Sequence, residues 1–166
     1  MLAIRNVLVG TDFSECAGVA LMYGRAIARQ FGARLHVVHA VEPVMMADVG
    51  IGGYAAAVPQ IQDELETAAK AELDQLLTED DRTQLRVTAA IVPFETPARA
   101  IVDYAGREAI DLIIIGTHGR RGFTHLLMGS VAESVVRSAP CPVLTVRHPE
   151  REFLAPDALV EAAKAV

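Results

Sequence analysis

The residues with the clearest chemical potential are three glycines and a serine with the spacing Gly116-x2-Gly119-x9-Gly129-Ser130. Glycine allows a positive φ and lets a ligand approach the backbone amides without a Cβ in the way. Ser130 and Val131 open a predicted helix, whose first amides lack intrahelical partners and lie at the positive end of the helix dipole. The stretch therefore has the properties of an anion site, and phosphate is the anion that it suits best.

The spacing differs from that of the common phosphate-binding loops. A Walker A loop requires a lysine directly before its Ser or Thr, and Gly129 occupies that position here; the GxGxxG spacing is also missing. A structural alternative exists for the serine, because Ser130-x-x-Glu133 fits the capping box. The two roles are compatible, since an N-cap hydroxyl lies where an anion would bind.

An acidic residue follows the first predicted strand, Val7–Gly10. Thr11 and Asp12 come at its carboxyl end, and Ser14 is a suitable N-cap for the next helix. A second strand, Leu112–Ile115, is a continuous run of branched apolar residues, which is typical of a parallel strand covered on both faces. Asp12 and the glycine loop should therefore both lie at the carboxyl ends of strands.

Hydrophobic periodicity and Gly/Pro positions divide the chain into alternating elements. We predict strands at 7–10, 35–41, 86–92, 112–115 and 143–147, and helices at 15–31, 61–77, 97–106 and 130–138. This alternation favours an α/β fold: one doubly wound, five-stranded parallel sheet, Rossmann-like, with helices on both faces. Ligands of such sheets bind outside the carboxyl ends of the strands, where the strand order reverses.

Three further features have open interpretations. Glu42–Gln60 reads as a long loop that either folds over a ligand or is a disordered insertion. We interpret His36 and His39 as sharing one face of the second strand; a metal pair is one reading, but no third ligand follows, so backbone or carboxylate partners are preferred. Residues 149–166 form a C-terminal tail with a short helix that Asp157 caps.

Composition excludes several classes of protein. The 166 residues are 52% hydrophobic and 22% charged, as in an ordinary globular domain, and the net charge of −6 disfavours a nucleic-acid partner. No apolar run is long enough for a membrane span, so we expect a cytoplasmic protein with no membrane partner. Cys16 and Cys141 fit neither a metal motif nor a disulfide framework, and we interpret both as buried thiols.

Two motifs resemble the ATP-binding branch of the universal stress protein family. One is Asn6-Val7-Leu8-Val9-Gly10-Thr11-Asp12-Phe13-Ser14, and the other combines Gly116-Thr117-His118-Gly119, Gly129-Ser130 and Ser138-Ala139-Pro140-Cys141-Pro142-Val143-Leu144. The resemblance covers roughly residues 3–148 and implies a nucleotide-binding domain over residues 1–148. It also implies the strand order 3-2-1-4-5. In that order Asp12 and Gly116 would lie on opposite sides of the switch point, the place where the strand order reverses.

The resemblance further implies a role for each site residue. Asp12 and the backbone around Ala40 would hold adenine, Gly116 and Gly119 would follow the ribose and phosphates, and the start of the last helix would hold the phosphate tail with Mg²⁺ or Mn²⁺. The predicted nucleotide-binding residues are Gly10, Thr11, Asp12, Ala40, Gly116, His118, Gly119, Gly129, Ser130 and Val131. A homodimer would form through the edge strand Val143–Arg147.

The sequence leaves three functions open. The preferred hypothesis is an ATP-binding protein that acts as a nucleotide-dependent switch in stress response or signalling. The alternatives are a protein-association module without nucleotide and a slow ATP hydrolase. An enzyme is disfavoured and we assign no catalytic residue, because Ser14 stands where a phosphoryl-transfer Asp12 would need a second acid. Ser130 likewise has no evident base and no Gly-x-Ser-x-Gly elbow.

Overall fold

The computed structural model describes residues 3–44, 58–93, 96–119 and 128–149. Residues 45–57 of the expected loop and the helix expected after Asp157 lie outside these ranges, so both stay predictions. The loop was predicted too long at its far end, because a helix already begins at Val58. Among the described helices, none is sufficiently long and apolar to cross a bilayer.

The centre of the molecule is a five-stranded parallel sheet in the order β3-β2-β1-β4-β5, which confirms the predicted fold class. The strands are β1 (Asn6–Thr11), β2 (Arg34–Val41), β3 (Thr88–Pro93), β4 (Leu112–Gly116) and β5 (Val143–Val146). The order reverses between β1 and β4, which pair from Val7↔Leu112 to Gly10↔Ile115. The carboxyl ends of these two strands therefore lie together, as a ligand site at the switch point requires.

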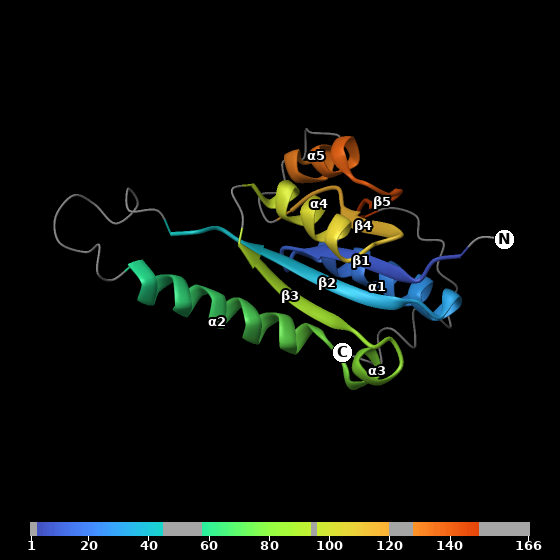
Figure 1. Cartoon of the computed structure of the whole chain (residues 1–166), viewed down its shortest axis with the longest axis horizontal. Helices are drawn as coiled ribbons and strands as arrows, with labels where there is room; N and C mark the ends of the chain where they lie inside the picture. Colours follow the sequence, from blue (N-terminus) through green and yellow to red (C-terminus); the bar gives the residue numbers. More distant parts are fainter. Residues whose placement is uncertain (1–2, 45–57, 94–95, 120–127, 150–166) are drawn as a thin grey trace.

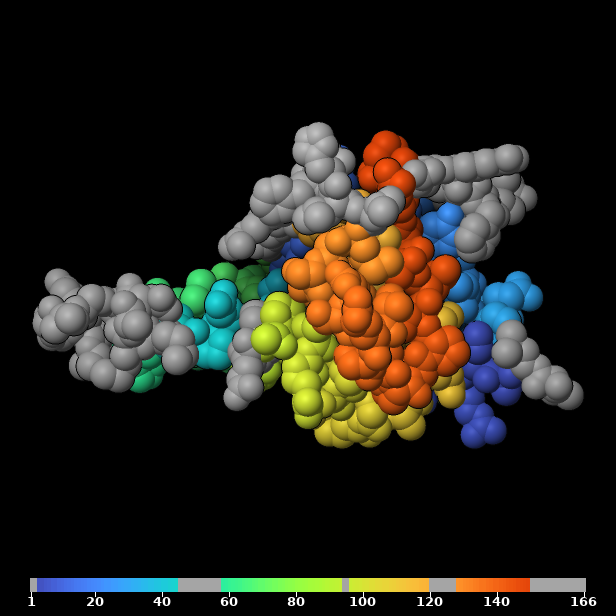
Figure 2. All heavy atoms as spheres, turned by 90° about the horizontal axis from the view of Figure 1, so that it is seen from above, coloured from blue at the N-terminus to red at the C-terminus, as the bar shows by residue number. Residues whose placement is uncertain are grey.

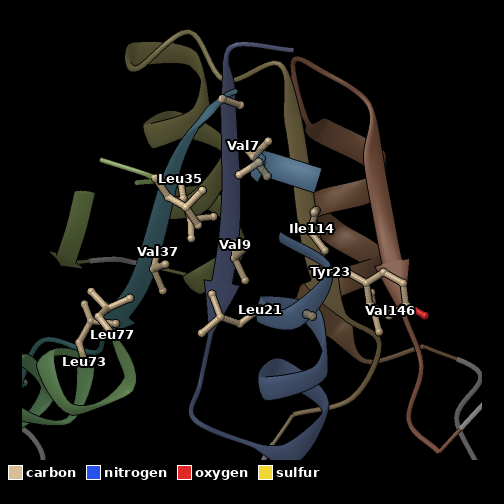
Figure 3. Close-up of a cluster of buried hydrophobic side chains, with 14 residues drawn as sticks. Val7, Val9, Leu21, Tyr23, Leu35, Val37, Leu73, Leu77, Ile114 and Val146 are labelled. Carbon is tan, nitrogen blue, oxygen red and sulfur yellow. The ribbon is translucent and has the colours of Figure 1, made fainter. Parts of the chain in front are cut away.

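Helices cover both faces of the sheet (Figure 1). The helices are α1 (Glu15–Phe31), α2 (Val58–Leu76), α3 (Glu79–Thr83), α4 (Pro97–Arg107) and α5 (Ser130–Ser138). On one face, α1 and the end of α2 enclose a core that includes Val9, Leu21 and Ile114 (Figure 3). On the other face α4 and α5 adjoin each other (Figures 1 and 2). They cover a second core built on Leu8, Ile101 and Ile113.

Successive side chains of a strand point to opposite faces of the sheet, which explains the two cores. In β1, Val7 and Val9 belong to the α1 face and Leu8 to the α4 face, and all three are 0% exposed. Each such side chain contributes about 1.5–3 kcal/mol through burial. The central strands are therefore held from both sides, and their carboxyl ends form a fixed platform for the turns that follow.

The ends of α1 follow the sequence signals closely. Ser14 is the N-cap and its hydroxyl accepts from the amide of Ala17 at 3.3 Å. Gly32 ends the helix in the left-handed region with φ 62°, where a glycine has no Cβ penalty. The beginning of α1 is therefore fixed directly after the turn that carries Asp12.

Several expectations about elements require correction. The short helix α3 was not foreseen, β3 begins at Thr88 and not at Arg86, and β5 ends one residue before Arg147. Leu65, which hydrophobic periodicity would place on the buried face of α2, is 45% exposed. The physical reason is that only the second half of α2, with Ala69 and Leu73, packs closely against the rest of the described chain.

The two histidines of β2 lie on opposite faces, so the expectation of a shared face was wrong. Residues three apart in a strand differ in parity and point to opposite sides. His36 is buried on the α4 face, where its Nδ1 lies 2.9 Å from the Tyr104 hydroxyl. His39 instead contacts the turn after β1. Within the described ranges, no three His, Cys, Asp or Glu residues are grouped so that they could hold a metal ion.

Candidate functional site

The turn after β1 is held by hydrogen bonds from its own side chains. The Thr11 hydroxyl accepts from the Phe13 amide at 3.0 Å. The Asp12 Oδ1 atom accepts from the Ser14 amide at 3.1 Å and from the Ser14 hydroxyl at 2.6 Å. Since Ser14 also caps α1, the carboxylate is tied to the helix start and cannot rotate without losing two hydrogen bonds.

The second carboxylate oxygen of Asp12 faces the glycine loop. A Cβ built on Gly119 would overlap Asp12 Oδ2 far inside van der Waals contact. Any side chain at position 119 would therefore displace the carboxylate or the loop. The structure thus brings together two predicted site residues that are more than a hundred positions apart in the sequence.

The backbone of Thr117 connects β4, β5 and the start of α5. Its amide donates to the carbonyl oxygen of Val146 at 2.7 Å, and its carbonyl oxygen accepts from the Gly129 amide at 2.6 Å. A Cβ on Gly129 would lie 3.0 Å from that carbonyl oxygen, closer than most such contacts. The Thr117 hydroxyl lies 3.0 Å from His118 Nδ1, which fixes the imidazole next to the loop.

The N-terminus of α5 corrects the predicted capping box. The N-cap is Gly129, and Ser130 is the first helical residue, so the serine hydroxyl is not in the capping position. Glu133 does not reach back to the cap; its carboxylate accepts from Arg137 at 2.8 Å. No side chain of the described residues caps this helix, which leaves its first amides available to an anion at the positive end of the helix dipole.

Two predicted glycines have packing roles that the sequence did not reveal. A Cβ on Gly116 would meet Cys16 Sγ at 2.9 Å and the Cys16 carbonyl carbon at 3.1 Å, because α1 crosses the end of β4 here. A Cβ on Gly10 would lie 3.2 Å from Ile101 of α4. Helix packing therefore accounts for both glycines without a ligand, and their binding role stays a prediction.

Residues 3–147 match the profile of the Universal stress protein family. The chain belongs to the universal stress protein family.

Individual relatives agree with this assignment. A universal stress protein of Thermus aquaticus is 36% identical over 143 residues, which cover 86% of this chain and 98% of the relative. Among solved structures, the universal stress protein UspA of Lactobacillus plantarum has a TM-score of 0.74 at 25% identity, and the alignment covers 89% of this chain and 100% of that one. A universal stress protein solved in complex with cAMP has a TM-score of 0.63 at 26% identity and 87% and 98% coverage.

Within this universal stress protein, the predicted site residues form two groups. Asp12, His118 and Gly119 lie on the turns after β1 and β4, while Ser130 and Val131 lie in the first turn of α5, joined to the β4 turn through Gly129. Ala40 is half-buried near the end of β2, on the strand next to β1, where it pairs with Val92 of β3.

The sequence analysis did not predict that two residues, Ser14 and His39, support the turn that carries Asp12. Ser14 was recognised only as a helix cap, although its spacing from Asp12 is also that of an Asx turn, a signal that could have identified it. For His39 the sequence favoured a backbone or carboxylate partner over a metal ion, and the carbonyl oxygen of Thr11 is such a partner, but the link to the Asp12 turn was not foreseen. Its contact with the turn depends on the register Thr11↔His39, which no local pattern encodes.

Proposed function

We propose that this universal stress protein binds an adenine nucleotide, ATP with Mg²⁺, and acts as a nucleotide-dependent switch in a stress response. The observation that carries the proposal is the contact of the Asp12 carboxylate with Gly119, beside a helix start that no described side chain caps. The Asp12 carboxylate can accept a hydrogen bond from a nucleobase amino group, and the amides at the start of α5 can bind phosphate. The cAMP complex of a relative at 26% identity supports an adenine nucleotide as the class of ligand.

The described residues fit ATP better than they fit an isolated metal ion. An anion at α5 would meet backbone amides and the exposed Ser130. A Mg²⁺ ion keeps several waters and commonly binds through substrate phosphates with one or two protein ligands. The lack of a three-ligand metal cluster in the described ranges is therefore compatible with a cation that the nucleotide brings.

A base-selectivity experiment tests the proposal. The Asp12 carboxylate would accept from the adenine amino group, whereas guanine presents a carbonyl there and would be repelled. We expect calorimetric titration to give tighter binding of ATP than of GTP. Asp12→Ala should lower the ATP affinity by at least about tenfold, the loss of a hydrogen bond to a charged group, and should reduce the preference for adenine.

Asp103→Ala is the matched control, because it removes the same charge from an exposed pair on α4. It should leave both affinities unchanged. Equal binding of ATP and GTP by the wild type would contradict the role of Asp12, and failure to bind either nucleotide would contradict the proposed function.

A switch and a hydrolase differ in turnover. Hydrolysis requires an oriented water and cationic groups that stabilise charge on the transferring phosphoryl group. The described part of the site offers amides and the Ser130 hydroxyl, which bind a ground state without matching the transition state. We expect phosphate release slower than about 1 per second. Faster turnover that disappears in Ser130→Ala would favour the hydrolase.

A further inference from the structure

His39 lies directly beside the Asp12 turn but does not belong to it. It is near the carboxyl end of β2 and pairs in register with Thr11 of β1. Its parity is that of Leu35 and Val37, so it lies on the α1 face of the sheet. The histidine is thus on the strand that adjoins the turn, one residue before Ala40.

Two contacts join the imidazole to the turn. Nδ1 lies 2.8 Å from the carbonyl oxygen of Thr11. Because a carbonyl oxygen only accepts, Nδ1 must carry the hydrogen in this contact. The ring also packs against Phe13 in a tilted arrangement, with centroids 4.4 Å apart and an angle of 39° between the planes. The histidine therefore holds the residues on both sides of Asp12.

The turn requires such support because its backbone is strained. Phe13 has φ 64°, a left-handed conformation that a bulky residue rarely adopts. Strained conformations persist only where surrounding contacts impose them, and they concentrate at functional sites. Relaxation of Phe13 would move Asp12 and the Ser14 amide, whose hydrogen bond fixes the carboxylate.

We infer that His39 is a positioning residue for the nucleotide site: through Thr11 and Phe13 it holds the strained turn that aims the Asp12 carboxylate. The inference rests on the proposed function for its ligand, an adenine nucleotide. His39 acts through the turn and does not itself contact the nucleotide.

Two variants separate the contacts of His39. His39→Phe keeps a ring against Phe13 and removes the donor, whereas His39→Asn places an amide N–H near the position of Nδ1. Val37→Ala is the control for general destabilisation, because Val37 is fully buried on the same strand and face but pairs in register with Val9, two positions before Thr11. All variants are compared at a temperature at which each is folded.

Two measurements are made on each variant: ATP affinity by calorimetry, and hydrogen exchange of the Phe13 and Ser14 amides by NMR. We expect His39→Phe to weaken ATP binding by about fivefold to tenfold, as for one lost hydrogen bond, and to accelerate exchange of both amides. His39→Asn should recover most of both effects. Val37→Ala should lower the melting temperature, with ATP affinity and the two amides close to wild type.

The outcomes distinguish the inference from the proposed function. If the wild type binds ATP but His39→Phe changes neither readout, or if Val37→Ala loses as much affinity, the inference is wrong and the proposed function stands. If the wild type binds no nucleotide, the proposed function is wrong, and so is the claim that His39 positions a nucleotide site. Amide exchange then still decides whether His39 holds the turn.

Discussion

At the level of single residues, the two oxygens of Asp12 have different surroundings. Oδ1 accepts two hydrogen bonds from Ser14, and Oδ2 faces Gly119. The first set of contacts makes the carboxylate rigid, and the second determines how closely the glycine loop can approach. A rigid acceptor loses little conformational freedom when it binds a ligand, so this arrangement favours affinity for a group that donates to it.

The first residue-level prediction concerns Gly119. Gly119→Ala should weaken ATP binding by about tenfold or more, since the new methyl group must push the Asp12 carboxylate away and a hydrogen bond to a charged group would be lost. Gly106→Ala in α4 is the matched control: its Cβ would meet nothing within 4 Å, and alanine should stabilise the helix by about 1 kcal/mol. Calorimetry and thermal unfolding of both variants test this, and undiminished affinity in Gly119→Ala would rule out the close approach.

The second residue-level prediction concerns His36. Burial lowers the pKa of His36 below its usual 6.5; Glu108 opposes this shift and Arg34 adds to it. Its Nε2 atom has no hydrogen-bond partner in the described structure. Below about pH 6.5 the unfolded chain binds a proton that the folded chain does not. The free energy of unfolding should therefore fall as the pH drops from 6.5 towards the lowered pKa.

Urea unfolding at pH 7.5 and pH 5.5 measures this loss, which cannot exceed about 1.4 kcal/mol per pH unit for one proton. The double variant His36→Phe/Tyr104→Phe removes the buried pair and should reduce the difference between the two pH values. His148→Asn changes an exposed histidine and should retain the wild-type difference. An unchanged difference in the double variant would assign the pH dependence to other groups.

At the level of elements, the sequence predicted those whose signals are local. The branched run Leu112–Ile115 gave β4, and Ser14 with Gly32 gave both ends of α1. The parallel sheet followed from alternation, and its order came from the family resemblance. The element α3 has only five residues, too few for hydrophobic periodicity, although its capping box from Thr78 to Asp81 was readable in the sequence.

From the sequence, the candidate site could be predicted in its position along the chain but not in the contacts between its parts. The glycine spacing located the loop, but the contact between Gly119 and Asp12 depends on how the turns after β1 and β4 meet in three dimensions. The predicted cap at Ser130 was off by one residue because a capping box and a serine at the first helical position look alike in sequence. For Gly116, a packing contact with α1 was indistinguishable from a ligand contact.

The element-level prediction concerns the buried ion pair that fixes α3 to α1. The side chains of Arg25 and Asp81 are 3% and 0% exposed, and Arg25 also donates to the Leu76 carbonyl oxygen at 2.9 Å. Burial raises the pKa of Asp81, but the hydrogen bonds from Arg25 and Thr78 outweigh it and leave the pKa below its usual value. Asp81→Asn would leave the Arg25 charge buried without a counterion.

We expect Asp81→Asn to reduce the free energy of unfolding by about 3–5 kcal/mol. The control is Asp74→Asn, which breaks the exposed pair with Arg82 and should cost less than about 1 kcal/mol. Denaturant unfolding of the two variants at neutral pH gives both values. Similar small losses in both would mean that solvent reaches Arg25 and that the pair does not hold α3 in place.

At the level of the whole molecule, β5 is the last strand of the sheet, and its outer edge has no strand partner in the described chain. The carbonyl oxygens of Pro142 and Val146 accept from the amides of Ile113 in β4 and of Thr117 directly after β4, at 3.0 and 2.7 Å. Successive residues of a strand direct their backbone N–H and C=O groups to opposite edges, so these groups of Val143 and Thr145 point away from β4. Such an edge invites another strand, and two copies could pair antiparallel about a two-fold axis.

This geometry decides which substitution tests the proposed homodimer. Lysine at Val146 is unsuitable because that side chain is 6% exposed and belongs to the α1-face core, against which Leu144 also packs. Thr145→Pro instead removes an outward N–H and leaves the bonds to β4 intact. Sedimentation at micromolar concentration should show a dimer for the wild type and a monomer for Thr145→Pro. Thr145→Val keeps the N–H and should remain a dimer, whereas a monomeric wild type, or a dimeric Thr145→Pro, would exclude pairing through β5.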